Sequence, residues 1–172
     1  GGQKERVGAY AAAMWRYYEE RCTAADHYLP PDNLQESPVW RVAHRTSPTN
    51  IGLYLLCIAA AHDFGLIDDD GMLERAERTL ATVEKLEKWK GNPYNWYDTR
   101  TLRPLSPRYV STVDSGNFAC CLVALRQALA ELRGARAESV AAMARRLQDG
   151  LDLTPMYNEK RALFHIGLDP DT

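Results

Sequence analysis

Apolar residues recur at helical spacing in five segments of the chain. Residues 5–22 carry them at every third or fourth position, and residues 71–89 and 136–150 add a charged face opposite the apolar stripe. Residues 48–63 are apolar on almost every side, as is the first half of residues 115–133. The pattern predicts five helices, of which the second and the fourth are buried on all sides.

Local signals indicate where these helices begin. Ser47 followed by Pro48 is a hydroxyl N-cap with proline at the first helical position. Asp114 or Ser115 is the expected cap of the fourth helix, because both residue types accept hydrogen bonds from free backbone N–H groups. Glycines that stop helices follow the second and fourth segments, at Gly65 and Gly134.

Two long stretches, residues 23–46 and 90–113, lack periodicity and contain several prolines, so they are predicted as loops. Residues 162–167 alternate like a short strand. Each long loop leads into one of the two buried helices. Long loops in a compact domain are usually functional. We therefore expect the functional site where these loops meet the N-termini of the buried helices.

The order of elements contains a weak internal repeat. It places Ser47 opposite Asp114 as the N-cap and Asn50 opposite Asn117. Each buried helix leads through a short turn into an amphipathic helix, and this hairpin is the building unit of an α/α barrel or toroid. A closed ring of such units needs about a dozen helices. We therefore expect an all-α fold of (α/α)6 barrel hairpins, incomplete here, with a short β segment at the C-terminus.

This fold makes residues 1–172 a single fragment of a larger domain. The second and fourth helices should be the most buried, while the third and fifth should each be exposed along one side. Because the inner helices would lack neighbours, we expect an exposed apolar face or a homo-oligomer formed through it. The two inner helices should run parallel, which brings both long loops to the same end.

The densest polar and aromatic cluster lies in the second long loop. Asn95, Trp96, Tyr97 and Asp98 follow one another there. Aromatic faces can stack on sugar rings while amides and carboxylates bind hydroxyl groups, so the mixture suits a carbohydrate site. The alternative is a packed loop whose aromatic residues only cover the end of the barrel.

A second group of candidates lies at the starts of the inner helices. Arg45, Thr46 and Asn50 surround the N-terminus of the second helix, a natural site for anions or hydroxyl groups. Asp114 is either the cap of the fourth helix or a carboxylate that faces the pocket. Arg45 and Arg108 are either ion-pair partners that fix the loops or ligand contacts.

Composition narrows the function classes. The net charge of −2 favours neither nucleic acid nor an anionic membrane surface. The longest apolar stretch is too short to span a bilayer. The four cysteines, expected as buried reduced thiols, and the four histidines show no spacing typical of a zinc site. We expect no metal and no organic cofactor.

Four sequence segments closely resemble the cyclic β-1,2-glucan synthases. They read PDN and QE within residues 31–36, HRTSPTNIGLY at 44–54, YNWYDT at 94–99 and PRYVSTVDSGN at 107–117. The similarity is dense over residues 28–120 and looser elsewhere. One departure follows Asn117, where Phe118, Ala119, Cys120 and Cys121 replace the small residues and histidine of the family pattern.

The resemblance implies part of a large bacterial protein anchored in the inner membrane, on its cytoplasmic side. The corresponding region of the family lies between a glycosyltransferase domain and a phosphorylase-like domain. It resembles an (α/α)6 glycoside hydrolase and cyclises linear glucan by transglycosylation. The family's catalytic carboxylates are then expected outside this chain. Asp98 and Asp114 are the best carboxylates within it, and we expect both to bind substrate.

The leading hypothesis is thus a portion that binds β-1,2-glucan, with the rest of the parent polypeptide as its partner. One alternative is half of a glycoside hydrolase or phosphorylase. The other is a non-catalytic helical scaffold that links the neighbouring domains.

Overall fold

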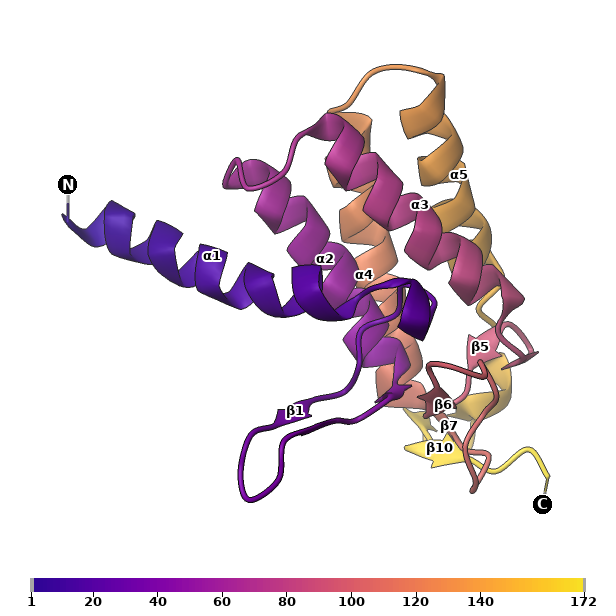
Figure 1. Cartoon of the computed structure of the whole chain (residues 1–172). Helices are drawn as coiled ribbons and strands as arrows, with labels where there is room; N and C mark the ends of the chain where they lie inside the picture. Colours follow the sequence, from indigo (N-terminus) through magenta and orange to yellow (C-terminus); the bar gives the residue numbers. More distant parts are fainter. Residues whose placement is uncertain (1, 172) are drawn as a thin grey trace.

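Five α-helices dominate this computed structural model, which describes residues 2–171. Four of them form a bundle, and the first helix lies across it and extends away from it (Figure 1). Their bounds are α1 Gly2–Arg21, α2 Pro48–Asp63, α3 Asp69–Lys85, α4 Thr112–Ala130 and α5 Ala135–Asp149.

Short antiparallel pairs of two-residue strands organise the loops. The first long loop contributes β1 Leu34–Gln35, which pairs with β2 Arg41–Val42, and β3 Arg45–Thr46, which pairs with β6 Tyr97–Asp98. The other pairs are β4 Lys88–Trp89 with β5 Asn92–Pro93, β7 Val110–Ser111 with β10 Gly167–Leu168, and β8 Tyr157–Asn158 with β9 Leu163–Phe164. Two single turns of 3-10 helix, Ala24–Asp26 and Thr154–Met156, complete the order. The strand expected over 162–167 is thus split between β9 and β10.

The two inner helices, α2 and α4, lie parallel and side by side. Thr49 near the start of α2 contacts Asp114, and further along Gly52 lies against Phe118 and Cys121. A Cβ atom at Gly52 would stand 2.9 Å from the Cβ of Cys121. The two helices therefore approach closely because residue 52 has no side chain.

The outer helices α3 and α5 pack against each other and against the inner pair. Their apolar stripes are buried, with Leu80 and Val140 fully enclosed. On the surface, Arg136 pairs with Glu77 at 2.8 Å and Arg146 pairs with Glu84 at 2.8 Å. The expected exposure of the outer helices along one side is confirmed, and the element order is that of inner and outer helical hairpins.

The start of α4 corrects one prediction. The cap is Ser111, whose Oγ accepts a hydrogen bond from the backbone N–H of Asp114 at 3.1 Å. The helix therefore begins at Thr112 rather than 115, and Asp114 lies in its first turn. A hydroxyl followed three residues later by an acidic residue resembles a capping box. Structurally, Ser47 corresponds to Ser111 and not to Asp114.

The end of α3 corrects a second prediction. The helix stops at Lys85 rather than 89, because Lys88 folds back over its last turn. The Nζ of Lys88 donates to the carbonyl oxygens of Val83 at 2.5 Å and Leu86 at 2.9 Å. Burial there lowers the pKa of Lys88. Lys88 thus satisfies backbone acceptors at the helix end instead of pairing with Glu84 along a continuing helix.

The prediction that α2 and α4 are buried on all sides is wrong. Leu53 is 47% exposed, Val113 61% and Val123 42%, and Cys120 on the same helix as Val123 is exposed as well. Within residues 2–171 no element covers this side, so α2 and α4 are no more enclosed than α3. The expected exposed apolar face is confirmed. The burial expected for all four cysteines holds for Cys121 only, because Cys22 and Cys57 are half-buried and Cys120 is exposed.

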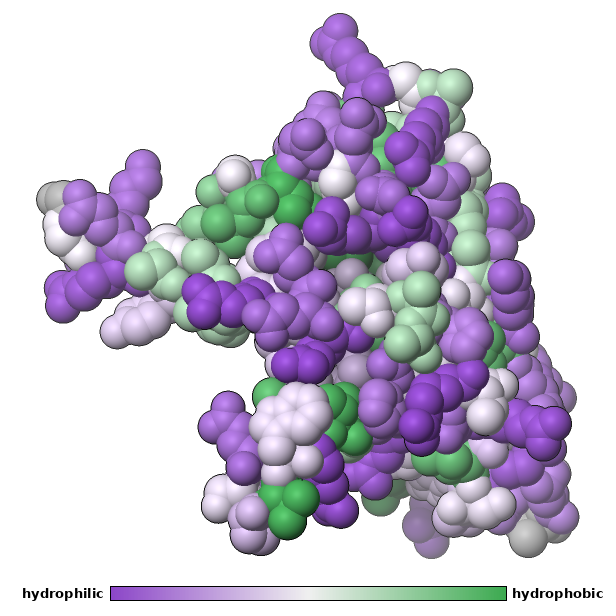
Figure 2. All heavy atoms as spheres, viewed as in Figure 1, coloured by the Kyte–Doolittle hydropathy of each residue, from purple (hydrophilic) through white to green (hydrophobic). Residues whose placement is uncertain are grey.

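The first helix is attached through its C-terminal half. Trp15 and Tyr18 of α1 stack on Tyr54 of α2, with ring centroids 6.5 Å and 5.1 Å from it. Residues toward the N-terminus leave the bundle, and apolar side chains gather where α1 faces the end of α2 (Figures 1 and 2). A wedge between the two helices is left open there.

Candidate functional site

The two long loops meet at the N-terminal end of the inner helices. In the β3–β6 pair, Arg45 lies opposite Asp98 and Thr46 lies opposite Tyr97. The backbone N–H of Thr99 also donates to the carbonyl of His44 at 3.1 Å. The prediction that the 94–99 loop and the segment from Arg45 to Asn50 lie at the same end is confirmed.

The first turns of α2 and α4 share a hydrogen-bonded group of side chains. The Thr49 hydroxyl donates to Oδ1 of Asp114 at 2.7 Å, and the Nδ2 of Asn117 donates to the Thr49 hydroxyl at 3.1 Å. The positive ends of both helix dipoles point toward this group, which places the Asp114 side chain where a negative charge interacts favourably with the helix ends. A fixed negative charge and an amide thus stand side by side.

Asp32 connects the first long loop to Asn50 in the first turn of α2 and to Arg45 before it. Its Oδ1 accepts from the Nδ2 of Asn50 at 3.0 Å, and its Oδ2 accepts from the guanidinium of Arg45 at 3.1 Å. The same guanidinium lies 4.8 Å from the ring centroid of Trp96. Arg45 therefore contacts both a carboxylate and an aromatic face, so its orientation is set from two sides.

Asn95 joins Trp96 to Asp114. In the amide orientation that satisfies both of its ends, its nitrogen donates to Oδ2 of Asp114 and its oxygen accepts from Nε1 of Trp96, each at 3.1 Å. The connected set is called the polar cluster from here on. It consists of Asp32, Arg45, Thr49, Asn50, Asn95, Trp96, Asp114 and Asn117.

Two of the sequence-predicted residues are enclosed in the core beside the cluster. Thr46 and Tyr97 are both 0% exposed. The Tyr97 hydroxyl donates to the Glu87 carbonyl at 2.6 Å and accepts from the Tyr94 N–H at 2.7 Å. Burial raises the pKa of Tyr97. The Tyr97 side chain holds the loop in place through these hydrogen bonds, and because both side chains are buried neither is open to a ligand.

Asp98 shapes a turn beside the cluster. Its Oδ1 accepts from the backbone N–H groups of Arg100 at 2.8 Å and Thr101 at 2.9 Å. Desolvation opposes ionisation of Asp98, but the hydrogen bonds from Thr101 and Arg100 outweigh it and hold its pKa below the usual value. Asp98 and Asp114 are thus held by different partners.

Arg108 points to a different part of the loop. Its guanidinium hydrogen-bonds to the carboxylate of Glu87 and the hydroxyl of Tyr94, and it lies 4.6 Å from the Tyr94 ring centroid. These contacts are the loop-fixing role that the sequence left open as an alternative to ligand contact. Of the nine predicted site residues, the cluster brings together Arg45, Asn50, Asn95, Trp96 and Asp114.

Sequence reasoning missed three members of the cluster as site residues. Asp32 belongs to the PDN segment, and Asn117 was matched to Asn50 only as a repeat position. Thr49 follows the cap and proline that mark the start of α2. The repeat was the available signal for Thr49 and Asn117, since it predicted that the starts of two parallel helices lie at the same end, whereas no sequence signal indicated Asp32.

A buried carboxylate supports the loops beneath the cluster. Asp26 is 4% exposed, accepts a hydrogen bond from the Thr99 hydroxyl and lies 2.7 Å from the Nδ1 of His44. A buried carboxylate is costly without such partners. Asp26 thus ties the 3-10 turn Ala24–Asp26 to His44 and Thr99, the residues that flank β3 and β6.

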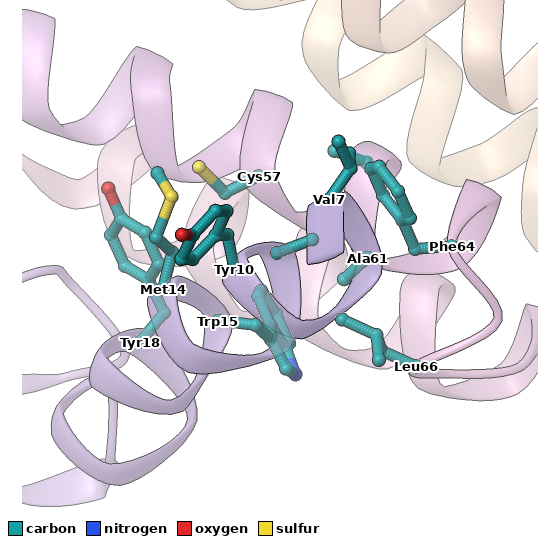
Figure 3. Close-up of a pocket in the computed structure, with 11 residues that line it drawn as sticks. Val7, Tyr10, Met14, Trp15, Tyr18, Cys57, Ala61, Phe64 and Leu66 are labelled. Atoms are coloured by element: carbon teal, nitrogen blue, oxygen red, sulfur yellow. The ribbon is translucent and has the colours of Figure 1, made fainter. Parts of the chain in front are cut away.

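Apart from the polar cluster, a hollow lies in the wedge between α1 and the C-terminal end of α2 (Figure 3). It is a cavity of about 290 Å³. Apolar and aromatic side chains line it, among them Tyr10, Met14, Trp15, Cys57 and Phe64. The polar cluster lies at the other end of α2, which is about 24 Å long at the usual rise per residue. The wedge lacks the fixed polar groups that a sugar would need.

No group of three or more His, Cys, Asp or Glu side chains within residues 2–171 is placed to hold a metal ion. None of the helices in that range combines the length and the apolar character needed to cross a bilayer.

The fold is similar to that of solved carbohydrate-active enzymes. A β-1,2-glucanase from Parabacteroides distasonis superposes with a TM-score of 0.82 at 16% identity, over 96% of this chain and 24% of that one. An endo-β-1,2-glucanase from Chitinophaga pinensis, solved with sophorotriose and glucose, superposes with a TM-score of 0.80 at 14% identity, over 99% of this chain and 42% of that one. The chain thus has the hairpins of an (α/α)6 barrel-type fold.

Sequence comparison confirms the resemblance to the cyclic β-1,2-glucan synthases. The chain is 49% identical over 121 residues to "Cyclic beta-(1,2)-glucan synthase NdvB" of Rhizobium meliloti (strain 1021). The match includes 70% of this chain but 4% of that relative's length. A family described as "Protein of unknown function (DUF3131)" matches residues 9–144, which include all of α1 to α4 except the first residues of α1. The chain belongs to this family.

Proposed function

We propose that the chain is the β-1,2-glucan-binding portion of a cyclic β-1,2-glucan synthase, within the module that cyclises linear glucan by transglycosylation. The observation that carries the proposal is the polar cluster, in which Trp96 stands among fixed hydrogen-bonding groups at the meeting point of both long loops. Two further facts support it. The curated relative is named for cyclic β-1,2-glucan synthesis, and two structural neighbours are titled as β-1,2-glucanases.

The chemistry of the cluster matches a polyhydroxyl ligand. An indole ring presents a flat apolar face on which the C–H face of a glucose ring can pack. Asp114 accepts hydrogen bonds, and the amides of Asn50 and Asn117 both donate and accept them. Arg45 fixes the indole from one side. Because these groups are already held by one another, little ordering would be needed on binding.

The catalytic carboxylates are proposed to lie outside this chain. A retaining mechanism requires two carboxyl groups about 5–5.5 Å apart on either side of the scissile bond. Asp98 is committed to a turn and Asp114 to Thr49 and Asn95. Both therefore serve the substrate site in this proposal, Asp98 by shaping its loop and Asp114 by contact.

The exposed apolar face is assigned to further helices of the parent polypeptide. The chain spans 38–42% of several solved helical chains that it resembles, so those folds contain more helices than residues 2–171 supply. Such helices would cover Leu53 and Val123 and fill the wedge beside α1. The parent is further proposed to be membrane-anchored, with this portion on the cytoplasmic side; proteolysis of it in inverted but not in right-side-out vesicles would test that placement.

Calorimetric titration of the full-length protein with linear β-1,2-glucan tests the binding proposal. Trp96→Ala should weaken binding by about 1–3 kcal/mol, with stacking of nucleic-acid bases on aromatic side chains as the guide. Tyr157→Ala removes an exposed aromatic residue that packs on Phe164, away from the cluster, and should leave the affinity unchanged. Equal affinities for all three proteins would instead favour the helical scaffold.

A further inference from the structure

A β-hairpin projects from the polar cluster. Residues 33–43 form it, with β1 and β2 as its paired strands, and it stands clear of the helical bundle in Figure 1. Its base is closed by two backbone hydrogen bonds, from Asp32 N–H to the Ala43 carbonyl at 3.1 Å and from Ala43 N–H to the Asn33 carbonyl at 2.9 Å. The residue at its base, Asp32, is the one that binds Asn50 and Arg45.

The hairpin carries an exposed tryptophan. Trp40 is 57% exposed, and the guanidinium of Arg21 lies 5.3 Å from its ring centroid. Trp96 in the cluster is arranged in the same way, with Arg45 at 4.8 Å. In both cases an arginine guanidinium lies over one face of an indole ring, as expected for a cation–π pair. Because Trp40 is exposed, packing in the core does not explain the large aromatic residue at this position.

The base of the hairpin is held both by α1 and, through Asp32, by the cluster. The Tyr17 hydroxyl of α1 donates to the Pro31 carbonyl at 2.8 Å, and Asp32 follows directly in sequence. Between Ala43 and Trp40 the chain advances three residues, which is about 10 Å in an extended strand. Trp40 thus stands farther out than the base of the hairpin, on a support that is tied to the cluster.

We propose that Trp40 is a second stacking platform, which takes a glucose ring of the same β-1,2-glucan chain beyond the units held at the cluster. The inference rests on the proposed function. The surroundings favour a sugar over a protein partner, because Gln35, Glu36, Ser37 and Arg41 flank the exposed Val39 and Trp40. Protein interfaces are marked by larger contiguous apolar patches. A platform remote from the cluster contributes only to chains long enough to reach it.

The test compares ligands of two lengths on the full-length protein. Titrations would use a β-1,2-linked trisaccharide and a long linear β-1,2-glucan, with Trp40→Ala, Trp40→Phe and Val39→Ala. Trp40→Ala should weaken binding of the long glucan by about fivefold or more and leave the trisaccharide affinity unchanged. Trp40→Phe keeps a flat ring and should restore most of the affinity, and Val39→Ala should change neither ligand's affinity.

The outcomes separate this inference from the proposed function. If Trp96→Ala weakens binding of both ligands while Trp40→Ala weakens neither, the cluster binds glucan and the platform is overturned. Equal weakening of both ligands by Trp40→Ala also overturns it, because that result indicates a general effect on the loop. If the unsubstituted protein binds neither ligand, the proposed function and the platform fail together.

Discussion

The Thr49 hydroxyl donates a hydrogen bond of 2.7 Å to Oδ1 of Asp114, and this contact joins the first turns of α2 and α4 across 65 positions of sequence. Both residues follow a serine cap, Ser47 in one case and Ser111 in the other. The contact therefore links two copies of the same helix start. It also places a carboxylate at the end of the inner helices where both long loops meet.

Replacing Asp114 by asparagine should affect both stability and glucan binding. The amide keeps the shape of the side chain but removes the charge that faces two helix N-termini, so the free energy of unfolding should fall by about 0.5–2 kcal/mol. Denaturant unfolding would measure the loss. Asp149→Asn, at an exposed site near the end of α5, is the matched control and should change stability little. An unaltered unfolding midpoint for Asp114→Asn would show that the contact contributes nothing.

The close approach of α2 and α4 predicts opposite effects for two glycine substitutions. Gly52→Ala places a Cβ 2.9 Å from the Cβ of Cys121, so the helices must separate and the free energy of unfolding should fall by about 1–3 kcal/mol. Gly8→Ala on α1 meets no atom within 4 Å and should be neutral or stabilising by up to about 1 kcal/mol. Thermal unfolding of both variants checks the prediction, and comparable losses at both sites would argue against tight packing at Gly52.

The exposed apolar face predicts different behaviour for the chain alone and within its parent. Leu53→Gln and Val123→Gln should reduce self-association of residues 1–172, because each removes exposed apolar surface. In the full-length protein the same changes should lower stability, since the polar group would then be buried. Light scattering and thermal unfolding provide the two readouts. Unchanged stability in the full-length protein would mean that no further helix covers this face.

Asp98 should make stability depend on pH in the acid range. The pKa of Asp98 is lowered in the folded chain. The ionised carboxylate therefore stabilises the fold fully at pH values above the pKa of the unfolded chain, which is about 4, and this stabilisation disappears as the pH falls through the lowered pKa of the folded chain. Asp98→Asn should therefore cost stability at neutral pH and much less in acid. Unfolding curves at the two conditions test it, with Asp63→Asn at the exposed end of α2 as a control for losing one charge. A constant difference at both pH values would exclude the turn as the origin.

The sequence predicted the helices well where local signals were strong. Ser47 and Pro48 place the start of α2 correctly, because a side-chain cap and a preset backbone angle act within a few residues. The start of α4 was misplaced because Asp114 and Ser115 are themselves good N-cap residues, whereas the cap in the structure is the earlier Ser111. The end of α3 was misplaced because Lys88 caps it by folding back, which helical periodicity does not reveal.

The place where the two long loops meet was predicted better than the side chains that meet there. The repeat indicated where the loops converge, yet which loop side chains turn inward depends on pairing between distant strands. Tyr97 was expected to bind substrate, and Arg108 either to bind ligand or to fix the loop. In the structure Tyr97 is buried and hydrogen-bonded to the Glu87 carbonyl, and Arg108 hydrogen-bonds to Glu87 and Tyr94. Asp32 lies 18 positions before Asn50, and only the fold of the intervening hairpin brings them together.

The central claim is that the polar cluster holds β-1,2-glucan, and the most direct measurement is a crystal structure of the full-length protein soaked with a linear β-1,2-linked oligosaccharide. The account predicts a glucose ring packed on Trp96, with hydroxyl groups within hydrogen-bonding distance of Asp114 and of Asn50 or Asn117. Oligosaccharide bound elsewhere, with the cluster left empty at a saturating concentration, would contradict the account.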